Sequence, residues 1–188
     1  MNILTEHRSV SRLSTGSLAL FIILASESIF FATMLVAYIA LRDQSILPVE
    51  HTLRRLIIPV ANTLILLVST FFAWRAIVSI RRGKTLTLKS WLLFTVLLGF
   101  VFIAGQIYEF SRGGMHIDDH AYGGIFFTLI GFHGLHVLAG LVFLIINLLR
   151  ARLGDFSAIH HDAIMLGTWF WYYVAAVWLV LFAALYMI

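Results

Sequence analysis

The sequence predicts an all-α integral membrane protein, folded as a single membrane domain over residues 1–188 with five transmembrane helices. Hydrophobic residues make up 61% of the chain and charged residues 12%, with a mean hydropathy of +0.98. Soluble domains carry about 25% charged residues, so this composition leaves no segment for a soluble domain. Five apolar segments each reach the length of about 20 residues that a helix needs to cross a bilayer. They cover residues 14–41, 57–80, 90–110, 122–149 and 163–188.

The first segment, residues 14–41, carries Glu27 at its midpoint. A carboxylate at this depth costs a few kcal/mol even on lenient insertion scales, so Glu27 requires a partner or a function. The segment is too long for the apolar part of a signal peptide and does not end in a small-residue cleavage site, so we expect it to be retained.

In the second segment, Pro59 is expected in the first turn, where its missing N–H does no harm. Asn62 supplies a polar group for helix packing.

The third and fifth segments differ in where their polar and aromatic residues lie. The third, residues 90–110, ends with Gln106 and Glu109 one turn apart, which we interpret as interfacial polar residues available for helix packing. The fifth, residues 163–188, is rich in aromatic residues that serve packing and interface anchoring. There is no cysteine in the chain, which excludes disulfides and thiolate metal sites.

The fourth segment, residues 122–149, is expected to be the inner helix of the bundle. At 100° per residue, small or polar residues fall on two nearly opposite faces of this helix. Membrane helices meet through small residues and interhelical hydrogen bonds, so both faces are expected to contact protein. One face holds Gly124, Thr128, Gly131 and Leu135, and the other holds His133, His136 and Gly140.

The distribution of basic residues predicts the orientation of the chain. Nine of the 13 Lys and Arg residues fall on the side of the N-terminus, and four fall on the other side. Positive charge is enriched in cytoplasmic loops, so we expect the N-terminus in the cytoplasm and the C-terminus outside. Because the basic residues lie in short loops beside the spans, we expect no nucleic-acid partner.

His133 and His136 lie three residues apart and therefore project from one side of the helix. They can be read as two ligands of a metal or haem, or as buried histidines that hydrogen-bond to neighbouring helices. A metal would need one or two further ligands, and Glu27 is the only other donor within a span at matching depth. At 1.5 Å per residue, Glu27 lies roughly 20 Å from one end of its helix and His133 roughly 17 Å from the opposite end. A contact between Glu27 and a histidine is therefore allowed, and we expect no metal on this chain.

Glu27 has three interpretations that the residues leave open: proton handling, contact with a lipid headgroup, or a structural hydrogen bond between helices.

Two polar clusters lie in loops, and both are read as solvated rather than metal-binding. They are Asp118, Asp119 and His120, and His160, His161 and Asp162. The spans hold no nucleophile with a base, no phosphate loop and no histidine pair across two helices, which indicates a chain with no catalytic residues.

Four blocks of the sequence resemble the subunit III family of haem–copper respiratory oxidases, which includes cytochrome c oxidase and quinol oxidase subunits III. In order along the chain they are Ser26-Glu27-Ser28-Ile29-Phe30-Phe31, Pro59-Val60-Ala61-Asn62-Thr63, Gln106-Ile107-Tyr108-Glu109-Phe110, and Tyr122-Gly123-Gly124-Ile125-Phe126-Phe127 with Gly131-Phe132-His133-Gly134-Leu135-His136-Val137. The fifth segment departs from the family pattern, because Tyr172 stands for the usual histidine, Ala175 for the usual aspartate and Met165 near a frequent glutamate. The chain resembles a divergent five-helix bacterial member.

The resemblance implies a part of an oxygen-reducing oxidoreductase complex that carries no redox centre itself. Such a subunit packs against subunit I, which holds the haems and copper, and binds structural phospholipid in a cleft between its helices. The resemblance implies that Glu27 is linked to proton uptake and to durability during turnover, and that His133 and His136 belong to the cleft or to helix packing. It further implies a multi-pass protein of the bacterial cytoplasmic membrane, in contact with other oxidase subunits and available to a respiratory supercomplex.

Two alternatives to this interpretation stay open from the sequence. One is the accessory membrane protein of nitric oxide reductase, which belongs to the same superfamily. The other is a free-standing b-type cytochrome or transporter subunit that uses the two histidines. The electron donor, cytochrome c or quinol, is not determined by these residues.

Overall fold

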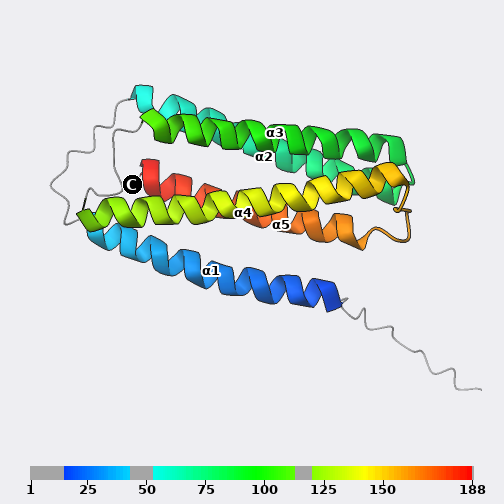
Figure 1. The fold of residues 1–188 in the computed structure, drawn as a ribbon, viewed down its shortest axis with the longest axis horizontal. Coiled ribbons are helices and arrows are strands. Elements are labelled where there is room, and N and C mark those ends of the chain that lie inside the picture. The colour runs from blue at the N-terminus through cyan, green and yellow to red at the C-terminus, as the bar shows by residue number, and fades with distance from the viewer. Residues whose placement is uncertain (1–14, 43–52, 113–119, 188) are drawn as a thin grey trace, which may run out of the picture.

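The computed structural model describes residues 15–42, 53–112 and 120–187, and this part of the chain is almost entirely helical (Figure 1). The helices are α1 (Thr15–Arg42), α2 (Leu53–Arg81), α3 (Thr85–Arg112), α4 (His120–Leu153) and α5 (Asp162–Phe182), and α5 continues into the π-helical turn η1 (Ala183–Met187). Each of the five helices is long and apolar enough to cross a membrane. The predicted all-α membrane bundle is confirmed, whereas the orientation of the termini stays a prediction.

Helices extend beyond the apolar segments from which they were predicted, because backbone hydrogen bonding continues into the polar interface. The clearest case is α2, which begins at Leu53, four residues before the expected start. Pro59 therefore lies inside the helix, and its predicted place in the first turn is wrong. The carbonyl four residues before a proline loses its helical donor, a cost that falls here close to the start of α2.

The helices form three layers, with α4 and α5 between α1 on one side and α2 with α3 on the other (Figure 1). The contact between α2 and α3 is the most extensive in the described chain. These two helices are joined by a tight turn at Gly83, whose φ of 69° lies in the left-handed region that favours glycine. The turn sets α2 and α3 side by side and antiparallel.

The main core lies among α2, α3, α4 and α5, and two fully buried indoles of α5 organise it. Trp171 Nε1–H donates to Ser69 Oγ at 3.0 Å, and Trp178 Nε1–H donates to Thr63 Oγ1 at 2.9 Å. Both hydroxyls belong to α2, so each indole places its polar atom against a partner inside the bilayer. Buried tryptophan normally finds such a partner.

The first helix lies at the edge of this core. In the apolar 18-residue stretch of α1, 6% of the residues are buried inside the chain. In the corresponding stretches of the other four helices, 33–39% of the residues are buried. A small second cluster holds α1 against α4 and α5, and its buried members are Phe31, Tyr38, Leu129 and Leu181. Most of the surface of α1 therefore faces away from the rest of the chain.

Candidate functional site

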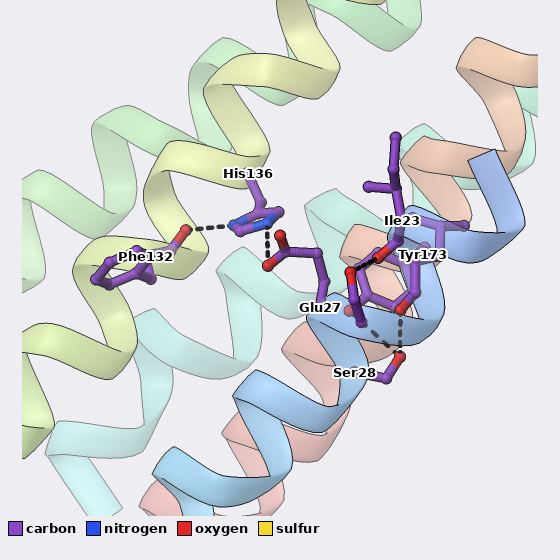
Figure 2. A network of polar contacts seen from close by, with 8 residues as sticks. Ile23, Glu27, Ser28, Phe132, His136 and Tyr173 are labelled. Carbon is purple, nitrogen blue, oxygen red and sulfur yellow. Dashed lines mark hydrogen bonds and ion pairs between the residues drawn. The ribbon is translucent and has the colours of Figure 1, made fainter. Parts of the chain in front are cut away.

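Glu27 of α1 and His136 of α4 form a polar pair where the two helices meet (Figure 2). Glu27 Oε2 lies 3.2 Å from His136 Nε2. Glu27 is near the middle of the first span, and His136 is near the middle of the fourth. The structure therefore joins the predicted mid-membrane carboxyl to one of the two predicted histidines. We refer to these residues as the Glu27–His136 pair.

The contacts of His136 indicate one proton shared between the two residues of this pair. His136 Nδ1 lies 2.7 Å from the carbonyl oxygen of Phe132, one turn earlier on α4. A carbonyl oxygen only accepts, so Nδ1 carries a hydrogen. The contact between Nε2 and Glu27 Oε2 then requires one proton between these two atoms, carried by either the carboxyl or the imidazole. Both arrangements leave the pair without net charge, which suits its depth in the membrane.

Aromatic rings surround His136, while hydroxyl groups lie beside Glu27. The His136 ring stands at 5.1 Å from the Phe31 ring, edge to face, and is stacked at 6.5 Å from the Phe170 ring. Ser28 Oγ donates to the Leu24 carbonyl at 2.7 Å and lies 3.4 Å from the Tyr173 hydroxyl. Because Ser28 uses its only hydrogen on that carbonyl, Tyr173 is the donor in the second contact.

The Glu27–His136 pair is partly open on the outside of the chain. The side chain of Glu27 is 33% exposed and that of His136 is 16% exposed. Both ring nitrogens of His136 are engaged, one by Glu27 and one by Phe132. This arrangement suits proton exchange within the pair and leaves no ring nitrogen of His136 for a metal.

The other histidine of the sequence pattern, His133, does not reach Glu27. It is 1% exposed, is stacked on Trp178 with a centroid distance of 5.2 Å, and meets Phe102 edge to face at 6.4 Å. Among the described residues, neither of its ring nitrogens has a hydrogen-bond partner. The two histidines share one side of α4 but diverge, because a step of three residues turns the helix by about 300°.

The three polar residues expected in helix packing take different positions. Asn62 Nδ2 donates to the Phe102 carbonyl oxygen at 3.1 Å, which joins α2 to α3. A Cβ on Gly105 would lie 2.7 Å from Asn62 Cγ, so this close approach requires glycine. Gln106 is buried, and neither polar atom of its amide has a hydrogen-bond partner in the part of the chain that the structure describes. Glu109 Oε1 accepts a short hydrogen bond from the Tyr186 hydroxyl of η1. Gln106 is thus buried within the bundle, and its expected place at the membrane interface stays a prediction.

The positions at which the fifth segment departs from the family pattern lie in different surroundings. Tyr172 is half-buried, Ala175 is buried, and Met165 Sδ accepts from Arg81 Nη2 at 3.5 Å near the other end of the bundle. Sequence reasoning missed the roles of Tyr173 beside Ser28 and of Tyr186 on Glu109. Both tyrosines belong to an aromatic-rich segment, and no spacing rule distinguishes a hydrogen-bonding tyrosine from a packing one.

The loop clusters give no donor set in the part of the chain that is placed. Asp118 and Asp119 lie outside the described residues, as does the side chain of His120. In the other loop, Ser157 Oγ accepts from the backbone N–H of His160 at 3.1 Å, and Asp162 begins α5. Within residues 15–42, 53–112 and 120–187, no three His, Asp or Glu side chains gather as metal ligands would.

Known proteins resemble this chain over nearly its whole length. The model of a family described as "Cytochrome c oxidase subunit III" matches residues 6–188. A probable cytochrome c oxidase subunit 3 of Nocardia farcinica is 33% identical over 185 residues, which cover 96% of this chain and 91% of that protein. The cytochrome c oxidase subunit 3 of Thermostichus vulcanus is 32% identical over 173 residues, covering 91% of this chain and 86% of that protein. A probable subunit 3 of Mycobacterium tuberculosis is 33% identical over 185 residues, with coverage of 96% and 91%.

Proposed function

Because the chain belongs to the cytochrome c oxidase subunit III family, we propose that it is the non-catalytic subunit III of a proton-pumping haem–copper terminal oxidase. The chain is a multi-pass membrane protein with five spanning helices, and we assign it to a bacterial cytoplasmic membrane. In this proposal, haems and copper belong to partner subunits, and subunit I is the main contact. Phospholipid and other oxidase subunits complete its surroundings.

The observation that best supports a partner at α1 is the exposure of Glu27. One third of this side chain is open, and Glu27 is the only acidic or basic residue of α1 between Thr15 and Leu41. A carboxyl open to the middle of a bilayer is costly, whereas the same carboxyl covered by protein or by a bound lipid is not. We therefore propose that subunit I, with phospholipid in the remaining space, covers the open edge of the Glu27–His136 pair.

The Glu27–His136 pair has the chemistry to take up and release one proton at this place. Its carboxyl and imidazole share a single proton, and the Phe132 carbonyl holds the ring so that Nε2 faces Glu27. His136 is the positioning residue, and Glu27 is the group open to the partner. This arrangement supports a role of Glu27 in proton uptake by the oxidase and in its durability during turnover.

Co-purification tests the assignment to an oxidase. The complex is purified in mild detergent through a tag on this chain, the co-purifying chains are identified, and a reduced-minus-oxidised spectrum is recorded. A haem–copper subunit I in equal amount is the expected result. Haem bound to this chain alone would instead support a free-standing b-type cytochrome, and a nitric oxide reductase among the partners would support the accessory role in that enzyme.

Substitution of Glu27 tests the proton role. Glu27→Gln preserves the shape and one hydrogen bond to His136, so subunit assembly and haem content are expected to be unchanged. The amide cannot pass a proton, so proton delivery is altered and the oxidase loses activity after fewer turnovers. The matched control is Ser26→Ala on the same helix, since Ser26 Oγ donates only to the Ile23 carbonyl of α1. Equal pumping and equal durability in Glu27→Gln and wild type would leave Glu27 a purely structural role.

A further inference from the structure

Most of the unpartnered buried polar atoms of the described chain gather in three residues. Eight buried side-chain nitrogen and oxygen atoms in residues 15–42, 53–112 and 120–187 have no hydrogen-bond partner. Five of the eight are the two ring nitrogens of His133, the two amide atoms of Gln106 and Oε2 of Glu109. Buried polar groups in folded proteins are hydrogen-bonded in the great majority of cases. Such a concentration in one place therefore points to a partner that the side chains do not supply.

These three residues form a row that starts beside the Glu27–His136 pair. His133 lies one turn from His136 on α4, and the Phe31 ring is packed against both imidazoles, at 6.5 Å and 5.1 Å. His133 and Gln106 line the same cavity of about 360 Å³ between α3 and α4. Gly131 and Gly134 also line this cavity, and a Cβ on either would meet no atom within 4 Å. The first half of the row thus crosses from α4 to α3 at an open place in the packing.

The second half of the row follows α3 to its end. Gln106 and Glu109 are one turn apart on this helix, and Glu109 Oε1 accepts from the Tyr186 hydroxyl of η1. Oε2 of the same carboxyl is the unpartnered atom. Glu109 lies three residues before the end of α3, at the end of the bundle where η1 ends the described chain (Figure 1). The predicted topology places this end on the side opposite the cytoplasm.

We propose that Glu109, Gln106 and His133, together with water molecules, form a proton relay between the Glu27–His136 pair and this end of the bundle; the relay rests on the proton role proposed for Glu27. In this proposal, water molecules supply the hydrogen-bond partners of the five atoms, and His133 and Gln106 are the polar residues of a cavity whose other lining residues are apolar. The relay gives the pair an exchange route that does not pass through subunit I.

Each residue has the chemistry that its position in the relay requires. Glu109 can bind or release a proton at Oε2 while Oε1 holds Tyr186. The Gln106 amide does not titrate, but it donates and accepts, so it orders water between the two helices. A neutral His133 gains a proton at one ring nitrogen and gives up the hydrogen of the other. One proton enters the Glu27–His136 pair as one leaves it, so every bond to hydrogen that forms is matched by one that breaks and no group keeps a charge.

The rate at which the shared proton exchanges for deuterium tests the relay. The full-length chain in lipid nanodiscs is transferred to D₂O, and the carboxyl and imidazole infrared bands of the pair are followed over time, assigned by difference from Glu27→Gln. His133→Phe and Gln106→Leu remove the two middle members and are expected to slow exchange by about tenfold or more, since the open edge of the pair faces the bilayer interior, which holds no water. The matched control is Thr168→Val, which removes a buried, unpartnered hydroxyl of α5 outside the row and is expected to leave the rate unchanged.

Stability measurements on the same variants separate a relay from a mere packing defect. If the His133 nitrogens have no water partner, His133→Phe removes a buried unsatisfied group and raises the unfolding temperature without changing exchange. That result, or unchanged exchange in Gln106→Leu, overturns the relay. If His133→Phe does not fold, Gln106→Leu on the other helix decides alone. Because exchange is measured without oxygen reduction, failure of the relay leaves co-purification with subunit I and the turnover effect of Glu27→Gln untouched.

Discussion

Two parts of this bundle are held together by different means. The four helices α2 to α5 enclose Trp171 and Trp178, and each indole donates to a hydroxyl of α2. In contrast, α1 buries few side chains and contributes the carboxyl of a mid-membrane pair that is partly open to the outside. Lipid chains are as apolar as leucine, so an exposed apolar face has no cost in the bilayer, but an exposed carboxyl does. Within the described chain, α2 to α5 therefore share one buried core, whereas α1 lies at its edge, where the proposed partner would cover it.

The largest expected effect on the free energy of unfolding comes from truncating a buried tryptophan in the core of α2 to α5. Trp171→Ala removes a fully buried side chain together with its hydrogen bond to Ser69, and we expect a loss of about 3–5 kcal/mol in the free energy of unfolding. Trp74→Ala is the control, because Trp74 is 48% exposed. Unfolding of the chain in mixed detergent micelles measures both variants, and equal losses would contradict the proposed centre.

A smaller effect is expected from adding a methyl group at Gly140, where the backbone of α4 lies close to the Trp171 indole. A Cβ on Gly140 would lie 2.9 Å from Trp171 Cε3, so Gly140→Ala is expected to cost about 1–3 kcal/mol through overpacking. Gly134→Ala on the same helix has the same change in helix propensity, but its Cβ would meet no atom within 4 Å. The difference in unfolding free energy between the two alanine variants isolates the contact. A difference near zero would mean that Trp171 moves aside freely.

The smallest effect is expected on the outward face of α1. Ile29 is 71% exposed, so Ile29→Ala is expected to change the unfolding free energy of the isolated chain by no more than about 0.5 kcal/mol. If this face packs on subunit I as proposed, the same substitution lowers the amount of subunit I that stays bound during purification. Leu97→Ala on α3, where Leu97 is 50% exposed, is the matched control. A large stability loss in Ile29→Ala would instead show that α1 is supported within its own chain.

The residues of the four sequence blocks show which features of the structure can be predicted from the sequence. The number of spans follows from hydropathy, and Glu27, His133, His136 and Gln106 could all be singled out because polar residues are costly in a bilayer. Asn62 was expected in helix packing and does join α2 to α3. The position of Pro59 was wrong, because hydropathy marks where the apolar segment begins and not where the helix begins.

Hydropathy, motif spacing and residue type are enough to predict the membrane class, the five helices, the family and the polar residues that require an explanation. Which groups meet becomes visible in the folded bundle: His136 and not His133 contacts Glu27, Trp171 and Trp178 reach hydroxyls of α2, and Tyr186 reaches Glu109. The physical reason is that helical periodicity fixes the face on which a residue lies, but not the rotation and axial position of one helix against the next. Those are set by packing between helices, where small residues such as Gly105 and Gly140 allow the close approaches.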